Sequence, residues 1–351
     1  MNGLSNQPQW EKLKYTKTEI KKAGKTIAHS QSEEEISAAL IVIENWRAAH
    51  AYPLSVVFSK LNRLAKEETG VIVAQRLKRL ASLVNKLRRL GNTDLWKMQD
   101  IGGCRVIVPS IEDVYRLSKK YQESRVRHVL KKTYDYIQSP KVSGYRSLHL
   151  VYQFHSDENP DYNENMLIEI QLRTRIQHLW ATTVETMDLF KNSNLKNGQG
   201  TEEDTRFFAL ASSFLARLEG SNIVPNTPED TNSLLMEMKQ LDEKNKYLDF
   251  LSSIKVATKM NESDYEENSN GYCVLCLNYE TRHLSTKWFM PSKIQEAQEF
   301  RREREQQSKT NKEDCVLVRV SSFATLKEAY PNYYADISDF VDVFSRSFRT
   351  V

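Results

Sequence analysis

Alternating apolar and polar positions in the middle of the chain predict two neighbouring β-strands, SLHLVYQF and MLIEIQLRT. In the second run Glu169, Gln171 and Arg173 recur at every other position, so in a strand their side chains point to one face. The intervening aliphatic residues point to the other face, toward a core. A carboxylate, an amide and a guanidinium in one row are costly to bury unless a ligand satisfies them. The alternative is an edge strand with a solvated polar face.

The spacing of apolar residues predicts the other elements, and Gly and Pro mark where these elements end. Before the two strands we expect helices from Ser32 and from Pro53, a strand over VIVAQRLK, a helix at 79–90, a Gly-Gly turn, the buried strand CRVIV, a helix from Ile111 and a strand at 129–137. After them we expect helices at 175–190, 202–218 and 230–258, a β-hairpin, a charged helix at 292–312, a third strand and two short helices. This order predicts an α+β fold, in which a mixed β-sheet flanked by helices is followed by a smaller ββαβα module.

The 351 residues suffice for two domains, and the pattern changes along the chain. We expect four parts: a polar N-terminal arm at 1–31, a main domain at 32–220, a helical linker at 221–265 and a C-terminal α/β module at 266–351. The Asn- and Gly-rich stretch 191–200 predicts a loop of the kind that closes over ligands.

The formal net charge of +4 excludes a polycation that coats nucleic acid, yet basic residues are concentrated in one region. No Asp or Glu occurs between Thr69 and Asp94, and this stretch contains Arg76, Lys78, Arg79, Lys86, Arg88 and Arg89. Such a cluster attracts polyphosphate or RNA. The alternative is a solvated helix face.

Four cysteines, Cys104, Cys273, Cys276 and Cys315, are too few and too scattered for a disulfide framework. Three of them could form a zinc site with His283, but residues i and i+3 of a strand face opposite ways, so we expect buried thiols instead. The N-terminus has no apolar signal segment and no run is long enough to cross a membrane. We therefore expect a cytoplasmic protein with no membrane partner.

Five motifs occur in a fixed order: R-L-K at 76–78, Ser82 with Lys86, Asp100 before CRVIV, PKVSGYRSLH at 140–149 and EIQLRT at 169–174. In this order and spacing they resemble the synthetase domain of the RelA/SpoT family, over about residues 40–220. The resemblance implies a nucleotidyltransferase-like core and an ATP-dependent GTP/GDP diphosphokinase. Such an enzyme makes ppGpp or pppGpp by moving pyrophosphate from ATP to the 3′-hydroxyl of GDP or GTP, with AMP released. No His-Asp hydrolase motif precedes these elements, so the resemblance is to the small, synthetase-only members.

The resemblance implies a role for each matching residue. ATP would be bound by Arg76, Lys78, Ser82, Lys86 and Arg105. The acceptor would be bound by Lys141, Tyr145, His149, Gln171 and Arg173. Asp100 and Glu169 would be the catalytic residues and would share Mg²⁺, which prefers oxygen ligands, with Glu169 a ligand first and a general base second. The ion and the cations would offset charge on the transferring group.

Two other functions stay open. Some small relatives are toxins that pyrophosphorylate the 3′ CCA end of tRNA, and the C-terminal module would then be regulatory or neutralising. A non-catalytic nucleotide- or RNA-binding protein is the other, and the two carboxylates count against it. The chain has KTYD at 132–135 where long members have R-x-K-D, so the choice between GDP and GTP is open. Small synthetases often form tetramers, so the resemblance also implies a homo-oligomer unless the C-terminal extension blocks it.

Overall fold

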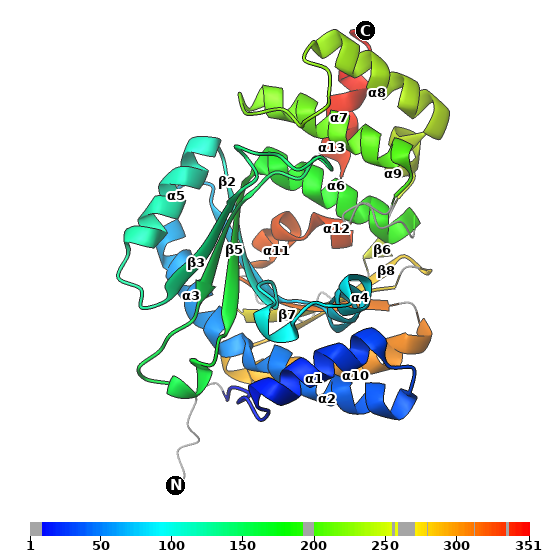
Figure 1. Cartoon of the computed structure of the whole chain (residues 1–351). Coiled ribbons are helices and arrows are strands. Elements are labelled where there is room, and N and C mark those ends of the chain that lie inside the picture. Colours follow the sequence, from blue (N-terminus) through cyan, green and yellow to red (C-terminus); the bar gives the residue numbers. More distant parts are fainter. Residues whose placement is uncertain are drawn as a thin grey trace.

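The computed structural model describes residues 9–191, 200–254, 257–258, 271–278, 280–311, 313–334 and 337–351. Within these residues a nine-stranded mixed β-sheet, in the order β3-β4-β5-β2-β1-β9-β7-β8-β6, is flanked by helices (Figure 1). This confirms the α+β fold that the sequence predicts. No helix in the described ranges is long and apolar enough to cross a membrane.

The strands are β1 (Ile72–Leu77), β2 (Gly102–Val108), β3 (Val129–Asp135), β4 (Leu148–Gln153), β5 (Leu167–Thr174), β6 (Ala257–Thr258), β7 (Gly271–Asn278), β8 (His283–Phe289) and β9 (Glu313–Val320). The helices are α1 (Lys17–His29), α2 (Glu33–Ala49), α3 (Ala51–Ala65), α4 (Leu80–Leu90), α5 (Ile111–Glu123), α6 (Arg175–Lys191), α7 (Glu202–Leu218), α8 (Thr231–Asn245), α9 (Tyr247–Ser253), α10 (Ile294–Asn311), α11 (Phe323–Ala329), α12 (Pro331–Tyr334) and α13 (Ser338–Ser347).

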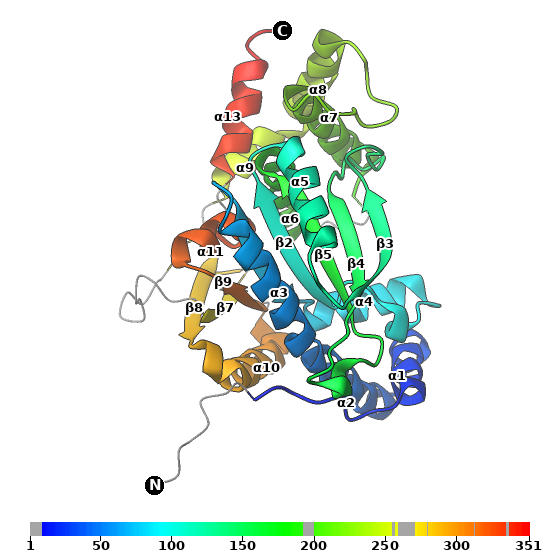
Figure 2. The same cartoon turned by 90° about the vertical axis from the view of Figure 1, so that its left-hand side faces the viewer.

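The two central strands of the sequence analysis are β4 and β5, which pair antiparallel, and β5 runs parallel to β2. The aliphatic face of β5 is fully buried against α3 and α5, which cover one side of this half of the sheet (Figure 2). The opposite side therefore presents the polar row of β5. This alternation confirms the interpretation of IEIQLR as a strand with one apolar and one polar face.

The C-terminal strands continue the same sheet. β9 pairs antiparallel with β1, Arg76 opposite Val318, and β7 and β8 follow as the expected hairpin. Helix α10 covers one face of these strands, and α11 with α12 covers the other. The ββαβα order is confirmed, and the sheet crosses the predicted boundary at residue 266. The division into domains stays a prediction.

Two local predictions were wrong. The single helix expected at 230–258 is two helices, because Lys246 adopts a left-handed conformation with φ of 56° between α8 and α9. The expected Gly-Gly turn is part of β2, where Gly102 pairs with Ile168. A Cβ at Gly102 would lie 2.8 Å from the end of the Ile168 side chain, so a larger residue there would require that side chain to shift.

The expected N-terminal arm is packed over much of its described part. Helix α1 begins at the capping box of Thr16 and Glu19 and buries Ile20 and Ile27 against α2 and α4. The sequence predicts only a polar arm here because these few apolar residues are surrounded by lysines. The predicted ligand-closing loop lies almost wholly at 192–199, outside the described residues.

All four cysteines are free and buried, as expected. Cys273 packs on the α11–α12 side of the sheet and Cys276 on the α10 side, so the two cannot share a metal ion. Cys276 and Cys315 do approach Glu313, whose carboxylate is bonded by Arg304 at 2.5 Å. Neither Cys273 nor His283 belongs to this group of side chains, so the zinc site considered from the sequence does not form among the described residues.

Candidate active site

Strand pairing places Arg76 and Glu169 on one line across the polar face of the sheet. Gly103 of β2 lies opposite Arg76 of β1 on one side and opposite Glu169 of β5 on the other. Directly opposed residues of neighbouring strands share a face, so both side chains point to the same side with a glycine between them. A Cβ on Gly103 would lie 3.9 Å from the Glu169 carbonyl oxygen, an ordinary contact distance. No side chain therefore stands between Arg76 and Glu169 on this line of the sheet.

The next line across the sheet carries three further predicted site residues. Arg105 of β2 lies opposite Gln171 of β5, and Gln171 lies opposite His149 of β4. Arg173 follows two positions later on β5, opposite Ile107. The row of alternating residues that the sequence indicated is thus joined, on the same face, by side chains from two other strands.

Asp100 lies just before β2 and is bonded by two ammonium groups. Lys78 Nζ is 2.7 Å from its Oδ2, and Lys86 Nζ, from α4, is 3.0 Å from the same oxygen. Burial alone would raise the pKa of Asp100, but the two lysines hold that pKa well below its usual range. Ser82 lies one turn before Lys86 on α4 and is half-buried. The structure therefore brings the predicted phosphate-binding lysines and the predicted metal ligand together.

Glu169 is the centre of a hydrogen-bonded chain. His149 Nδ1 lies 2.8 Å from Glu169 Oε1, and Gln171 Nε2 donates to Oε2 at 2.6 Å. The Tyr145 hydroxyl lies 2.8 Å from the other ring nitrogen of His149. Burial alone would raise the pKa of Glu169, yet the hydrogen bond from His149 lowers this pKa overall. With the carboxylate ionised, His149 donates through Nδ1 and accepts from the tyrosine.

Asp100 and Glu169 interact electrostatically. The charge of Asp100 acts on Glu169 and raises its pKa, against the larger effect of the hydrogen bond from His149. Asp100 lies three residues before Gly103, the residue of β2 that is opposite Glu169 on β5. A metal ion shared by the two carboxylates stays a prediction.

Two tyrosines that the sequence analysis did not single out belong to this site. Tyr136 lies edge-to-face with both Tyr145 and His149, at centroid distances of 5.9 and 5.4 Å. The Lys141 ammonium lies 4.2 Å from the Tyr136 ring centroid and 5.3 Å from that of Tyr145. Tyr134 is nearly parallel to Tyr136, with an interplanar angle of 4°. The spacing Tyr-Asp-Tyr at the end of a predicted strand was the available signal.

Residues of the C-terminal module cover Arg105. The Arg105 Nη1 donates to the Ala329 carbonyl at 2.7 Å, and its guanidinium lies 5.3 Å from the centroid of the Tyr330 ring. Nearby, His178 Nε2 lies 2.8 Å from the carbonyl of Glu328. Helices α11 and α12 thus lie over the polar face, between the sheet and α6 (Figure 1).

Arg173 is buried with unsatisfied donors. Its side chain is 1% exposed, and neither Nε nor Nη2 has a hydrogen-bond partner. Burial, together with the neighbouring charge of Arg105, lowers the pKa of Arg173 to about 9. Buried guanidinium donors without partners are costly, and an anion at this place would satisfy them.

Comparison with known proteins adds to this geometry. A family model described as a region found in RelA / SpoT proteins matches residues 75–194. The GTP pyrophosphokinase YwaC of Bacillus subtilis is 30% identical over 180 residues, which are 46% of this chain and 83% of that protein. The chain belongs to the RelA/SpoT family.

Other similar proteins are named as GTP pyrophosphokinases or alarmone synthetases. The GTP pyrophosphokinase YjbM of Bacillus subtilis is 31% identical over 125 residues, which are 35% of this chain and 58% of that protein. The small alarmone synthetase 1 of Bacillus subtilis, solved with its product pppGpp, is 27% identical, with 49% of this chain and 89% of that chain covered and a TM-score of 0.41. Small alarmone synthetase 2 of Bacillus subtilis has 27% identity, coverages of 50% and 93%, and a TM-score of 0.41. The family resemblance seen in the sequence is confirmed, and the roles of single residues stay predictions.

Proposed function

We propose that the protein is an alarmone synthetase, which transfers pyrophosphate from ATP to the 3′-hydroxyl of GDP or GTP and releases AMP. Family membership and the names of the relatives YwaC and YjbM support this activity. The observation that carries the proposal is the pair of buried carboxylates on neighbouring strands: Asp100, bonded by two lysines, precedes β2, and Glu169, bonded by His149, lies on β5. A binding protein would not require two carboxylates in this position.

Donor binding is assigned to Arg76, Lys78, Ser82, Lys86 and Arg105. In the free protein Lys78 and Lys86 neutralise Asp100, and in the complex they would offset charge on the ATP phosphates as well. Phosphoryl-type transfer relies on position and charge stabilisation more than on covalent chemistry by the protein. We therefore expect the ammonium groups of Lys78 and Lys86, already in place, to stabilise the charge of the phosphates during transfer.

Synthetases of this family use a divalent metal, and we assign Mg²⁺ to Asp100 and Glu169. Carboxylate oxygens are the ligands that Mg²⁺ prefers, usually one or two together with substrate phosphates. The strongly lowered pKa of Asp100 fits this role, because the group stays ionised and attracts positive charge. When bound, the ion would supply positive charge opposite the transferring group.

On the acceptor side, Tyr145 and Lys141 would hold the guanine base, and Gln171 and Arg173 would line the pocket. The unsatisfied Nε and Nη2 of Arg173 support an acceptor phosphate at that place. His149 would position Glu169 through their hydrogen bond of 2.8 Å. Because a metal-bound carboxylate is a poor base, Glu169 is a ligand first and a base second.

We also assign a regulatory role to the C-terminal module. The Ala329 carbonyl and the Tyr330 ring occupy the Arg105 guanidinium, which the donor phosphates would need. Helices α11 and α12 would have to move before Arg105 could contact ATP. The conformation described here is then a closed one.

One observation favours the second candidate function, pyrophosphorylation of the 3′ CCA end of tRNA. Tyr134 in the edge strand β3 and Tyr136 just after it have parallel rings, with Lys132 and Lys141 at 6.0 and 4.2 Å from their respective ring centroids. Rows of aromatic rings with interleaved cations bind single-stranded nucleic acid, because successive bases stack on them. A mononucleotide would not need the outer tyrosine.

The decisive experiment follows label from ATP. Full-length protein, wild type and Tyr330→Ala, is incubated with ATP labelled in the γ-phosphate and with GDP, GTP or deacylated tRNA in parallel. Label in ppGpp or pppGpp supports the lead function, and label in tRNA alone supports the second. No labelled acceptor with either protein, in the presence of Mg²⁺, would contradict both.

The expected homo-oligomer and the cytoplasmic location stay predictions. Light scattering on the full-length protein, coupled to size-exclusion chromatography, would measure the molar mass of the assembly directly. A tetramer would place this chain with small synthetases that assemble, and a monomer would indicate that the C-terminal module prevents assembly.

A further inference from the structure

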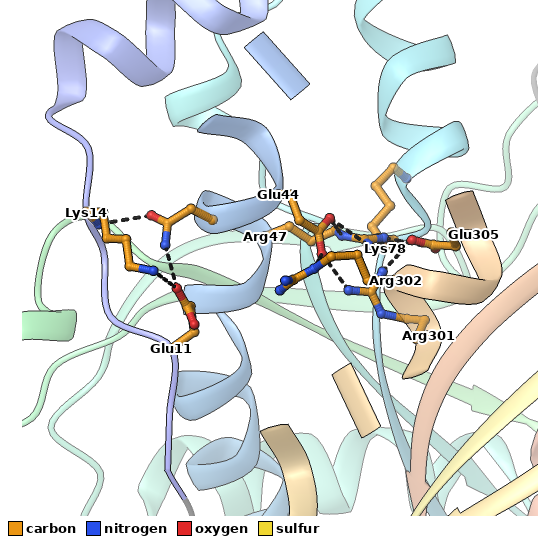
Figure 3. A network of polar contacts seen from close by, with 9 residues as sticks. Glu11, Lys14, Glu44, Arg47, Lys78, Arg301, Arg302 and Glu305 are labelled. Carbon is orange, nitrogen blue, oxygen red and sulfur yellow. Dashed lines mark hydrogen bonds and ion pairs between the residues drawn. The ribbon is translucent and has the colours of Figure 1, made fainter. Parts of the chain in front are cut away.

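A buried ionic network joins the C-terminal helix α10 to the end of β1 (Figure 3). Arg47 of α2 is only 1% exposed. Its Nη2 lies 2.7 Å from Glu305 of α10, and its Nη1 donates to the main-chain carbonyl of Lys78 at 3.1 Å. One guanidinium therefore binds the C-terminal module and the donor segment at the same time.

The network is closed by a second guanidinium. Arg301 of α10 donates to Glu305 and to Glu44 of α2, each at 2.6 Å. Glu44 in turn accepts from Arg47 Nε at 2.9 Å. Two cations and two anions alternate, so the group is nearly neutral although it is buried. Arg47 cannot shift without breaking bonds to two other helical residues.

Lys78 is fixed on both sides by such contacts. Its amide donates to the Ile101 carbonyl at 2.8 Å, and its own carbonyl accepts from Arg47. Its ammonium then reaches Asp100 at 2.7 Å. The next residue, Arg79, pairs with Asp314 of β9. The C-terminal module thus holds two consecutive residues at the start of the donor site.

Buried ion pairs contribute little net stability, since desolvation offsets their attraction, and apolar replacements are often as stable. A guanidinium is planar and rigid, so its N–H donors hold the groups that they bond in fixed positions. This network bonds the main chain at Lys78, in the proposed donor site. We therefore expect its role to be the positioning of that residue and not the stability of the fold.

We propose that Arg47, held by Glu305, is a positioning residue for the donor site: it fixes the main chain at Lys78 and so directs the Lys78 ammonium toward Asp100 and the ATP phosphates. The inference rests on the proposed function for its second half only. According to this proposal, α10 of the C-terminal module helps to position a donor-site residue, whereas α11 and α12 of the same module cover Arg105. Helix α10 builds the site from one face of the sheet, and α11–α12 covers it from the other.

The first test needs no activity. Full-length wild type, Arg47→Lys and Glu305→Gln are treated with a water-soluble amine reagent, and the modification rates of Lys78 and Lys86 are measured by mass spectrometry. Arg47→Lys keeps the charge but loses the fork, so Lys78 should react about fivefold faster, the change expected for one hydrogen bond. Lys86 contacts Asp100 from α4, outside the network, and its rate should not change. Glu305→Gln should act in the same direction.

The matched control is Arg302→Gln. Arg302 is the next residue on α10, is 41% exposed and lies 3.8 Å from Glu44, at the margin of the network. This variant should leave both lysines as in wild type. An unchanged Lys78 rate in both Arg47→Lys and Glu305→Gln would overturn the proposal, whether or not the protein is a synthetase. If Arg47→Lys does not fold, Glu305→Gln alone decides the result.

The second test separates positioning from stability and from closure. Positioning predicts that Arg47→Lys raises the KM for ATP about tenfold and leaves the KM for the acceptor unchanged. An equal change in both KM values would indicate a purely structural role and would overturn the proposal. Higher activity than wild type would also overturn it, because the network would then serve to keep the site closed. Absence of activity in both wild type and Tyr330→Ala would contradict the proposed function and leave the lysine-modification result valid.

Discussion

Replacing Tyr330 by alanine is the most direct test of closure by the C-terminal module. The Tyr330 side chain is 1% exposed, its ring lies over the Arg105 guanidinium, and its hydroxyl donates to the Gln75 carbonyl at 3.3 Å. These contacts exist only while α11 and α12 cover the sheet. The substitution should therefore destabilise the closed form and leave the open form nearly unchanged.

The size of the effect follows from the burial of the ring. Truncation of a buried aromatic side chain to alanine costs about 3–5 kcal/mol. If the substitution destabilises only the closed form, by about 3 kcal/mol, the fraction of protein in the open form rises by about 10²-fold, until the open form dominates. Apparent affinity is intrinsic affinity multiplied by the competent fraction, so the affinity for ATP should rise by up to about 10²-fold.

Titration calorimetry with a non-hydrolysable ATP analogue and Mg²⁺ measures this affinity on the full-length protein. Tyr330→Phe is the matched control, because it keeps the ring and loses only the hydroxyl bond, for an expected change of about fivefold. A folded Tyr330→Ala protein with unchanged affinity would refute closure by this residue. Lower affinity would place Tyr330 inside the ATP site itself.

Three further predictions concern the chemistry. Glu169→Gln should lower the rate of transfer by about 10²–10⁴-fold with the thermal unfolding temperature nearly kept, because the amide has the same shape; full activity would remove Glu169 from the mechanism. Tyr145→Ala should weaken acceptor binding far more than ATP binding, and Tyr145→Phe should weaken it less; equal losses for both ligands, measured by equilibrium binding, would indicate packing. Chelation of divalent metal should stop turnover and readdition of Mg²⁺ should restore it, whereas metal-independent transfer would contradict the roles of Asp100 and Glu169.

Local patterns were sufficient to predict the polar row of the site. Strict alternation in IEIQLRT fixes which side chains share a face, because a strand has a period of two. The structure adds that Glu169 and Gln171 bond each other and that His149 joins them from β4. The register between β4 and β5 decides that contact, and no local pattern encodes it.

The parts that the sequence did not reveal depend on contacts between distant segments. The composition of β1 predicts a strand. Besides β2, this strand pairs with β9, which lies more than two hundred residues later in the chain. The cover on Arg105 and the network at Arg47 both follow from that pairing. In the sequence, Tyr330 and Arg301 are an ordinary aromatic residue and one of several arginines on a charged helix. Their importance arises from burial, which a single sequence does not show.

The opposed effects of the C-terminal module lead to a final prediction. Closure acts on Arg105 through α11 and α12, and positioning acts on Lys78 through α10, so the two effects involve different residues and different faces of the sheet. Changes at independent sites add in free energy. In the double variant Tyr330→Ala, Arg47→Lys, the gain in ATP affinity from opening and the loss from misplacing Lys78 should therefore multiply as fold-changes.

Binding of the ATP analogue to wild type, both single variants and the double variant forms a complete cycle. Additivity within about 0.5 kcal/mol would indicate that the module can release Arg105 while α10 still holds Lys78 in place. Strong coupling would mean that α10 moves together with α11 and α12. Opening would then disturb Lys78 as well, and activation would need a further event to restore the donor site.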